Sequence, residues 1–383
     1  MRVVVVGGGV AGLTVAALLG RTGGHSVTVL ERIPAYGDAG YGLGLYPLGG
    51  AVFNALGARE QVRERSCELA TYRVCGPTGE TLQEVSLREL LAPYGQMRGI
   101  SRADVLAILA SNVPEGSLHL GVTCTAVRAV DGGVVVETSD GSQYEGDVVV
   151  VADGMHSRVR ESLFGPAKEH DTGFDAWMWW APMGDFEPTS VTEYWGPTAF
   201  VGVYPAKDAL NVAVGIPRRL SPEPGDAPEA ILSRLRELVR EHNPAGASLD
   251  VWSVAKGAPF PWRLVDVRAP ALSGLDDRVA LVGDSGVGFL PTAGVGASNA
   301  MRSAAALAYE LSLADAGSAP AAVARWNTRV GDLVRGNQED SRKLAKVMMV
   351  EHKTTSRLVD AVMKHMPITM MTKSIVRSME APF

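Results

Sequence analysis

The start of the chain carries the pattern that most limits what it can fold into. Val3 to Val6 is a short apolar run that predicts a buried strand, and the glycine-rich segment Gly7 to Gly12 follows at once. Leu13 to Leu19 predicts a helix, and Val27 to Leu30 predicts a second strand that ends at Glu31-Arg32. A strand, a Gly-x-Gly-x-x-Gly turn, a helix and a strand closed by an acid are typical of a dinucleotide-binding βαβ unit.

Each glycine of this turn has a physical role in such a unit. Gly7 allows the tight turn, Gly9 lets a pyrophosphate approach the backbone, and Gly12 lets helix and strand pack closely. The N–H groups around Ala11, at the start of the helix, offer hydrogen bonds and a partial positive charge to phosphates. Glu31 stands where a carboxylate accepts a hydrogen bond from a ribose hydroxyl. The segment therefore predicts a nucleotide cofactor.

The same stretch has a second interpretation. From Val3 to Gly20 it carries no charge and Arg2 precedes it, which by hydropathy alone is also typical of a signal peptide or a short membrane helix. The glycines argue against this interpretation, because glycine is unfavourable in a continuous helix. The second strand with its terminal acid argues against it too. We expect no transmembrane or targeting segment and a cytoplasmic protein.

Composition and cysteine content exclude several other classes. A chain of 383 residues, 46% hydrophobic and 20% charged, predicts a globular enzyme of two domains. A net charge of −6 gives no support for nucleic-acid binding. Cys67, Cys75 and Cys124 lack the Cys-x-x-Cys spacing, so they predict a reducing compartment and no disulfide framework. The scattered histidines add no metal site.

Local patterns predict the next elements. They are a helix over 51–65, hairpins over 70–85 and 122–138, a helix that starts at Arg102 with Ser101 as its cap, and a strand over 147–151. Tyr41 to Gly50 is glycine-rich and uncharged, so it is either a connecting loop or backbone that runs close to a flat cofactor. Ala152-Asp153-Gly154 ends the strand and leads into a helix, which on its own is ordinary turn chemistry.

Aromatic residues crowd into the middle of the chain. From Phe174 to Val254 the pattern predicts a mostly antiparallel sheet with one face over a pocket, although such rings also pack into the core of a sheet. A helix is predicted over 230–239. The candidate substrate contacts are Tyr46, Trp179, Tyr194 and Tyr204.

A second strand–loop–helix unit follows late in the chain. Val279 to Val282 predicts a buried strand that ends at Gly283-Asp284, and Pro291 to Gly296 is a glycine-rich loop before a helix over 297–313. Backbone N–H groups of such a loop and an acid directly after a strand both face the edge of a sheet where α/β folds bind ligands. This unit therefore predicts a second contribution to the same nucleotide site.

The tail from Ser341 to Phe383 differs from the rest in charge. It holds seven of the thirteen methionines and eight Lys or Arg against three acids. We predict helices that pack across the domain interface with a solvated basic face. Contact with a membrane surface or a partner through this basic tail is the alternative.

Taken together, three separated motifs resemble those of the single-component FAD-dependent monooxygenases of the aromatic hydroxylase type, the p-hydroxybenzoate hydroxylase fold. They are Gly7-x-Gly9-x-x-Gly12 with Glu31-Arg32, Ala152-Asp153-Gly154 with Ser157-x-Val159-Arg160, and Gly283-Asp284 with Pro291-x-x-Gly294-x-Gly296. The resemblance implies an α/β fold: a Rossmann-like FAD-binding domain, a mostly antiparallel β-sheet substrate domain and C-terminal helices. The implied limits are 1–66, 98–165 and 276–340 for the FAD-binding domain, 67–97 and 166–275 for the substrate domain, and 341–383 for the C-terminal segment.

The resemblance implies a role for each motif residue. Glu31 binds the adenosine ribose, Arg32 lies near the adenine, and Cys124 contacts the adenine through its backbone. Arg102 reaches the pyrophosphate or ribitol, Asp153 lies near the pyrophosphate, and Asp284 binds the ribitol. The backbone of Pro291, Gly294, Val295 and Gly296 lines the isoalloxazine ring. Two positions depart from the family pattern, Val287 for a frequent His and Val295 for a frequent Gln. We expect them to make the substrate pocket less polar.

In this interpretation FAD carries the chemistry. NADH or NADPH reduces the flavin, O2 adds at its C4a atom, and the hydroperoxide passes one oxygen atom to an aromatic or bulky apolar molecule. The protein must exclude water, because a wet hydroperoxide decays. We identify no side chain as an acid or base. Hydroxylation, epoxidation and oxidation of a ketone to an ester all remain open, as do a monomer and a homodimer.

Three alternatives remain. Trp177-x-Trp179-x-Ala181-Pro182 is similar to the signature of flavin-dependent halogenases, but that family needs an early lysine and this chain has none before Lys168. An oxygen-independent flavin reductase or dehydrogenase is the second alternative. A non-catalytic FAD- or NAD-binding module is the third.

Overall fold

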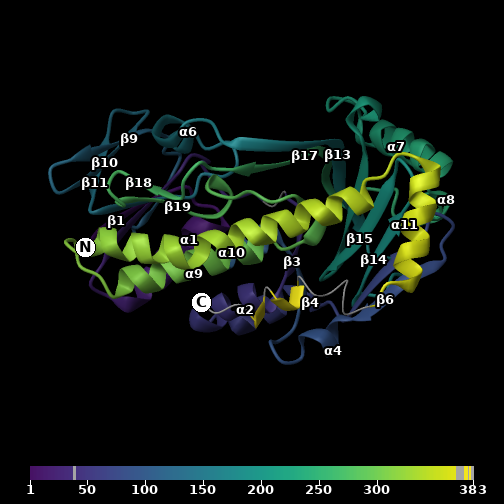
Figure 1. The fold of residues 1–383 in the computed structure, drawn as a ribbon, viewed down its shortest axis with the longest axis horizontal. Coiled ribbons are helices and arrows are strands. Elements are labelled where there is room, and N and C mark those ends of the chain that lie inside the picture. The colour runs from purple at the N-terminus through teal and green to yellow at the C-terminus, as the bar shows by residue number, and fades with distance from the viewer. Residues whose placement is uncertain (38–39, 368–374, 378, 381–383) are drawn as a thin grey trace.

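The computed structural model describes residues 1–37, 40–367, 375–377 and 379–380. Two large sheets occupy opposite ends of the molecule, one around β1 (Arg2–Val6) and the other around β13 (Lys168–Pro182) (Figure 1). The long helix α10 (Ala319–Met348) runs along the molecule from one end to the other. This arrangement leaves a space between the two sheets where a site can form.

The sheet at the amino-terminal end has six strands in the order β18-β19-β12-β1-β2-β8. All pairs are parallel except that of β18 with β19. Parallel neighbours need a crossover, and α1 (Val10–Thr22) supplies it between β1 and β2 as predicted. The other strands are β2 (Ser26–Glu31), β8 (Leu118–Leu120), β12 (Val148–Val151), β18 (Ser273–Gly274) and β19 (Val279–Leu281).

Both faces of this sheet are covered, which explains why its strands are apolar throughout. Val3 and Val5 pack toward α1 and toward α9 (Gly296–Ser312). Val4 and Val6 face the other way, onto a small antiparallel sheet. That small sheet consists of β9 (Cys124–Val130), β10 (Gly133–Thr138) and β11 (Gln143–Gly146), and α6 (Arg158–Phe164) lies beside it.

The sheet at the other end has seven strands in the order β17-β13-β16-β15-β14-β5-β6. Every pair is antiparallel except β14 with β5. The mostly antiparallel sheet predicted for the middle of the chain is therefore confirmed. Its other strands are β5 (Thr71–Cys75), β6 (Thr81–Ser86), β14 (Ser190–Trp195), β15 (Phe200–Ala206), β16 (Ala209–Pro217) and β17 (Lys256–Arg268).

Alternate residues of this sheet face two different environments. One face packs onto α7 (Pro228–His242) and α8 (Pro244–Ser248), and this core contains Trp177, Val201 and Val212. The opposite face looks toward the six-stranded sheet. Because side chains alternate along a strand, the residue parity decides which of the two environments each side chain meets.

A third layer lies under the space between the sheets. Among the described residues it contains a three-stranded sheet, β3-β7-β4, and four short helices. The single helix predicted over 51–65 is wrong, because the chain turns at Gly57, whose φ of +69° ends one helix before the next begins. The elements are β3 (Gly42–Leu45), α2 (Pro47–Ala55), α3 (Arg59–Glu64), β4 (Ser66–Glu68), α4 (Leu87–Leu91), β7 (Arg98–Ser101) and α5 (Arg102–Ala110).

The carboxy-terminal part is helical, as predicted. Residue 341, the expected start of the C-terminal segment, lies inside α10, and the expected limit between residues 66 and 67 lies inside β4. The domain limits stay a prediction. After α10, α11 (Lys353–His365) packs against β6. None of the described helices combines the length and the apolar character that a membrane span requires.

The fold class predicted from the sequence is confirmed. A Rossmann-like sheet, a mostly antiparallel sheet and C-terminal helices are all present. Two short 3₁₀ turns, η2 (Gly283–Ser285) and η3 (Pro291–Ala293), carry the third motif. Another 3₁₀ turn, η1 (Arg218–Leu220), follows β16.

Candidate active site

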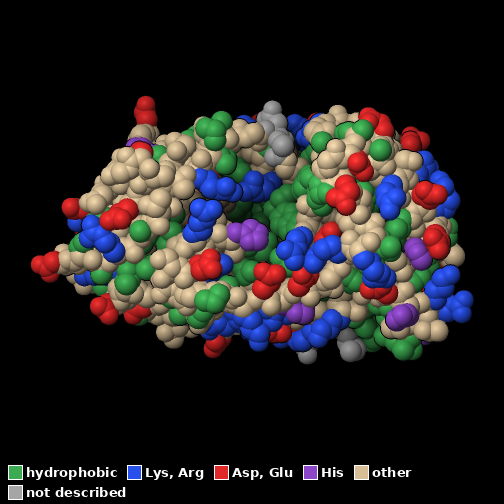
Figure 2. Space-filling view, turned by 90° about the horizontal axis from the view of Figure 1, so that it is seen from above, with side chains coloured by type: hydrophobic (Ala, Val, Ile, Leu, Met, Phe, Trp, Pro, Cys, Tyr) green, Lys and Arg blue, Asp and Glu red, His purple; other side chains and the backbone are tan. Residues whose placement is uncertain are grey.

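A cavity of about 410 Å³ lies between the two large sheets. It extends from the glycine turn at Gly9 to the far sheet at Tyr204 and to Met348 at the end of α10. Seen from above, the molecule is hollowed between its two ends, and hydrophobic side chains line the hollow (Figure 2). Segments far apart in the sequence therefore meet at one continuous space, as the three motifs predicted.

The glycine turn has the geometry that a bound pyrophosphate needs. A Cβ at Gly7, where φ is +107°, would lie 2.4 Å from the Ala152 carbonyl oxygen, and a Cβ at Gly12 would lie 2.0 Å from the Gly7 oxygen. Gly9 differs, because the nearest atom to its Cβ position is 4.0 Å away. Two glycines are thus required by the protein itself, and the third leaves room for a ligand. Ala11 lies in the first turn of α1 and also lines the cavity.

Glu31 lies beside this turn at the end of β2. Its Oε2 accepts a hydrogen bond of 2.6 Å from the Gly8 N–H, and its Oε1 accepts one of 3.0 Å from the Ile33 N–H. The Tyr36 hydroxyl donates to the Gly8 oxygen at 2.7 Å. These bonds fix the carboxylate next to the glycine turn, where a ribose hydroxyl can donate to its remaining lone pairs. Arg32 is exposed beside it.

The second motif is joined to the third by Arg160. Its buried guanidinium donates through Nη1 to the Ser285 oxygen at 3.1 Å, while Ser285 Oγ donates to the Val151 oxygen at 2.6 Å. Ser157 caps α6 by accepting a 3.0 Å bond from the Arg160 N–H. Asp153 Oδ1 is buried with no hydrogen-bond partner among the described atoms, and burial raises the pKa of this carboxyl. Asp153 itself does not line the cavity, but its neighbours Ala152 and Gly154 do, so this carboxyl lies directly behind the cavity wall.

Asp284 and Arg102 both line the cavity, close enough for the charge of Arg102 to act on the Asp284 carboxyl. Asp284 follows β19, and burial raises the pKa of its carboxyl to about 6, while the charge of Arg102 opposes this shift. Arg102 stands at the first position of α5, which Ser101 caps through a 3.0 Å bond from the Asp104 N–H, as predicted. The Arg102 N–H donates to the Tyr41 oxygen at 2.9 Å, so the glycine-rich segment is held at the same place.

The loop from Pro291 to Gly296 borders the cavity on the side of α9. Pro291, Thr292, Ala293, Gly294 and Gly296 line it, and Gly294 adopts a left-handed conformation with φ of +61°. The Tyr46 hydroxyl points to this loop and donates to the Ala293 oxygen at 3.4 Å. The loop therefore presents backbone atoms to the cavity, as the resemblance implies for a segment beside the isoalloxazine ring.

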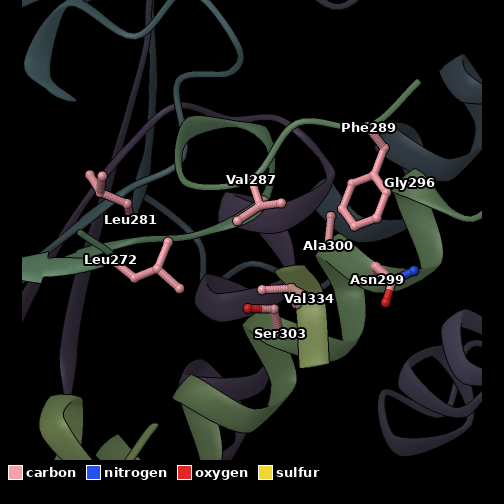
Figure 3. A pocket seen from close by; sticks show the side chains of 10 residues that line it. Leu272, Leu281, Val287, Phe289, Gly296, Asn299, Ala300, Ser303 and Val334 are labelled. Carbon is pink, nitrogen blue, oxygen red and sulfur yellow. The ribbon is translucent and has the colours of Figure 1, made fainter. Parts of the chain in front are cut away.

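The expected effect of Val287 and Val295 on this cavity is not found. Both side chains are buried in the core around α9, and neither lines the large cavity. Figure 3 shows Val287 beside Phe289 and above Ala300 of α9, around a void of about 10 Å³. Such a void is at the lower limit for a single water molecule. These two substitutions therefore change core packing rather than the polarity of the substrate pocket.

Cys124 lies at the start of β9, within electrostatic reach of Asp153. Its Sγ is 3.6 Å from the Ala126 oxygen, and burial raises the pKa of the thiol to about 12. The thiol is therefore neutral at ordinary pH and is no nucleophile. Cys124 does not line the large cavity, so the backbone contact with adenine that the resemblance implies stays a prediction. The described residues contain no cluster of His, Cys, Asp or Glu that could hold a metal ion.

Two of the four predicted substrate contacts line the cavity and two do not. Tyr46 and Tyr204 line it. Trp179 is buried in the core under α7 and α8, where its Nε1 donates to the Val251 oxygen at 2.8 Å, and Tyr194 packs against the same core. Residues of one parity on each strand face that core, so Met178 and Glu193 face the cavity instead. Trp177 and Trp179, the tryptophans similar to the halogenase signature, lie on the wrong face for that chemistry.

A buried carboxylate in the cavity wall, that of Glu193, was not predicted from the sequence. Glu193 accepts hydrogen bonds from the hydroxyls of Tyr72 and Tyr204, at 2.6 and 2.8 Å, and from Trp195 Nε1 at 3.0 Å. Burial raises the pKa of Glu193, and the three donors oppose this shift. The alternation of β14 could have indicated it, because Glu193 has the same parity as the buried Val191 and Trp195.

Comparison with known proteins agrees with this geometry. Residues 1–325 match a family described as "FAD binding domain". The chain belongs to this family. FAD is therefore its cofactor, and the open space at Gly9 and the half-buried carboxyl of Asp284 on the cavity wall fit such a group. NADH or NADPH is the reductant typical of the family.

Individual relatives narrow the class further. The chain is 28% identical to an aurachin C monooxygenase/isomerase of Stigmatella aurantiaca, over 88% of each chain. It is 33% identical to a 3-amino-4-hydroxybenzoate 2-monooxygenase of Streptomyces cremeus, over 79% of this chain and 76% of that protein. The structure of Klebsiella pneumoniae HpxO complexed with FAD and uric acid has the same fold, with a TM-score of 0.83, 19% identity and coverage of 100% and 97%. This chain is an FAD-dependent enzyme of the monooxygenase class.

Proposed function

We propose that this enzyme inserts one oxygen atom into a bulky aromatic or apolar small molecule, with NADH or NADPH as reductant. The observation that carries the proposal is the continuity of the cavity, which passes from the cofactor motifs to a wall of apolar side chains. That wall includes Phe174, Met178, Phe200, Trp262 and Met348. The volume of about 410 Å³ falls in the range of small-molecule sites, and it includes the cofactor end as well as the substrate end.

The chemistry that FAD supplies when bound is the activation of O2 with two electrons from the nicotinamide. For a hydroxylation, substrate C–H, O2, NAD(P)H and a proton give substrate C–OH, water and NAD(P)⁺. The residues of this chain bind and orient the reactants. Arg102 and Asp284 border the cofactor end, Tyr46 links that end to the substrate sheet, and Leu344 and Met349 exclude water from the far side.

Substrate-stimulated consumption of NADH or NADPH tests the function. The purified holoenzyme is mixed with NADH or NADPH and a panel of phenols, polyketides and alkenes, and mass spectrometry measures the masses of the products. We expect at least one compound to gain a single oxygen atom. A chlorinated product that requires chloride would favour a halogenase, and NAD(P)H oxidation without an oxygenated product would favour an oxygen-independent oxidoreductase.

We infer that the enzyme works in the cytoplasm, because Cys67, Cys75 and Cys124 are free thiols and burial raises the pKa of each. The basic tail does not need a membrane to account for its methionines. Met348 and Met349 line the cavity, and Met363 is buried against β6 and the end of α10. Cell fractionation tests the location, and light scattering of the purified holoenzyme separates a monomer from a homodimer.

A further inference from the structure

The cavity wall opposite the cofactor motifs carries a cluster of oxygen atoms on an otherwise apolar surface. Glu193, Tyr72 and Tyr204 form it, and all three side chains line the cavity. Tyr46 connects this cluster to the loop at Ala293. Burial and the charge of Glu193 raise the pKa of Tyr46, and the Tyr46 hydroxyl donates to the Ala293 oxygen. This cluster, which we call the Glu193 cluster, therefore stands beside the place where the reacting part of a substrate must lie.

The protons of this cluster are already engaged within the protein. Tyr72 and Tyr204 donate to the two carboxylate oxygens of Glu193, and Tyr46 donates to the Ala293 oxygen. A tyrosine hydroxyl has one proton, so a hydroxyl that donates inward can only accept from a ligand. Thr198, another hydroxyl of the cavity wall, likewise donates to the Glu351 oxygen at 3.1 Å. Toward the ligand, these groups offer acceptors.

The charged residues around the cavity also favour a ligand that is neutral and donates a hydrogen bond. Among the described residues that line it, Arg102 is the single Lys, Arg or His, and it faces Asp284 at the cofactor end. The substrate end contains the carboxylate of Glu193, whose three hydrogen-bond donors are all neutral. A ligand carboxylate placed there would lose its hydration without gaining a counter-ion, which is costly.

We propose that the Glu193 cluster selects an uncharged aromatic substrate that donates a hydrogen bond, a phenol O–H or an aromatic N–H, and rejects aromatic carboxylates. This inference rests on the proposed function and names its substrate class. It separates this enzyme from the relative named for 3-amino-4-hydroxybenzoate, a carboxylate. Tyr204 and Tyr72 accept from the substrate, and Glu193 acts as a positioning residue that turns both hydroxyls.

The proposal is tested by binding three matched ligands to the FAD-loaded enzyme. The change in flavin absorbance on ligand addition measures each Kd. The ligands are 2-naphthol, which donates, 2-methylnaphthalene, which has the same shape without a donor, and 2-naphthoate, which is an anion. A hydrogen bond between neutral groups contributes roughly 0.5–1.5 kcal/mol, or about 2-fold to 10-fold in Kd. We expect 2-naphthol to bind at least about 3-fold more tightly than either of the others.

Variants of the Glu193 cluster test whether it causes the preference for 2-naphthol. Tyr204→Phe and Tyr72→Phe remove an acceptor and keep the ring, so each should reduce the advantage of 2-naphthol over 2-methylnaphthalene several-fold. Glu193→Gln, which can donate, should also improve the binding of 2-naphthoate. Tyr194→Phe is the matched control, because Tyr194 follows Glu193 on β14 and faces the opposite core. It should leave all three affinities unchanged.

Several results would overturn the proposal. They are tighter binding of 2-naphthoate than of 2-naphthol, equal binding of 2-naphthol and 2-methylnaphthalene, no saturable binding of 2-naphthol, or an unchanged preference in both tyrosine variants. Flavin content and circular dichroism report whether each variant folds, and the two Phe variants decide the matter if Glu193→Gln does not. No turnover is needed. A correct binding order without oxygen insertion would refute the proposed function alone.

Discussion

Arg160 belongs to a motif that the resemblance links to the cofactor, yet its guanidinium donates to a backbone oxygen of the same chain. It bonds the Ser285 oxygen at the turn that also carries Asp284, and so it holds the second motif against the third. Sequence spacing predicted that these motifs meet, since both follow parallel strands of one sheet. It could not predict the bond itself, because the partner is a backbone carbonyl 125 residues away.

Replacing Arg160 tests this link. Arg160→Met should lower the free energy of unfolding by about 1.5–3 kcal/mol, because a charged hydrogen bond is lost and the Ser285 carbonyl stays buried. It should also weaken FAD binding, since the turn at Asp284 loses a support. Chemical denaturation and FAD titration of the apoenzyme measure both effects. The exposed Arg158, in the same helix, is the control, and an equal effect of Arg158→Met would contradict this role.

The glycines of the first turn should separate folding from cofactor binding. Gly12→Ala places a Cβ 2.0 Å from the Gly7 oxygen, so the apoenzyme should be destabilised. Gly9→Ala has space for its Cβ in the protein but takes the room that a pyrophosphate needs. We expect Gly9→Ala to keep the thermal stability of the apoenzyme and to lose FAD affinity at least 10-fold. Equal losses of apoenzyme stability in both variants would contradict this division.

Asp284 gives the apoenzyme a specific pH dependence. Its pKa is raised to about 6 in the folded state, so between pH 4 and 6 the folded protein keeps a proton that the unfolded chain has lost. The contribution of this group to stability therefore falls as the pH rises through that window, by about 3 kcal/mol. Asp284→Asn should gain stability relative to the wild type by this amount between pH 4 and 6, in urea denaturation. A difference that does not change with pH would refute the buried state of the carboxyl.

At the scale of elements, the strands of the seven-stranded sheet explain both the success and the failure of the sequence analysis. The sheet, its hairpin over 70–85 and the cap at Ser101 followed from local patterns. Which alternate residues face the cavity could not be predicted in this way, because both faces of the sheet carry large apolar side chains. Only the tertiary packing decides which face α7 and α8 cover. Trp179 and Tyr194 were therefore assigned to the wrong face, and Glu193 was overlooked.

Neighbouring residues of β13 should respond differently to truncation. Trp179→Ala should lower the free energy of unfolding by about 3–5 kcal/mol, because a fully buried indole leaves a cavity. Met178→Ala enlarges a cavity that already exists, so its main effect should be on the KM or Kd of the substrate. Urea denaturation and ligand titration measure the two quantities. A larger change of substrate affinity in Trp179→Ala than in Met178→Ala would contradict the parity.

At the scale of the whole molecule, α10 binds the two ends together. Its Arg342 forms a bidentate pair with the fully buried Asp266 of β17, at 2.6 and 2.8 Å, and Gln338 donates to the Val267 and Gly288 oxygens. The end of the same helix contributes Leu344 and Met348 to the cavity. Composition indicated a distinct tail beginning at residue 341, but charge patterns do not mark where a helix ends, and this helix continues to residue 348.

Breaking this pair should affect the whole fold. Arg342→Met leaves Asp266 buried without its counter-ion, so we expect a loss of about 3–5 kcal/mol in the free energy of unfolding. Lys343→Met is the control, because its pair with Asp340 is exposed and such pairs contribute about 0–1 kcal/mol. Thermal and urea denaturation of the holoenzymes compare the two. Similar losses in both variants would show that α10 does not join the ends in this way.

The proposed function requires that an oxygen atom of O2 be transferred to a substrate held between the two sheets. The most direct measurement is turnover of the FAD-loaded enzyme under oxygen-18 gas, with NADH or NADPH and the ligand that binds most tightly. We predict that each product molecule gains one oxygen-18 atom and that one nicotinamide is oxidised for it. A product whose new oxygen comes from water, or oxidation of NAD(P)H with no oxygenated product from any ligand that binds, would contradict the account.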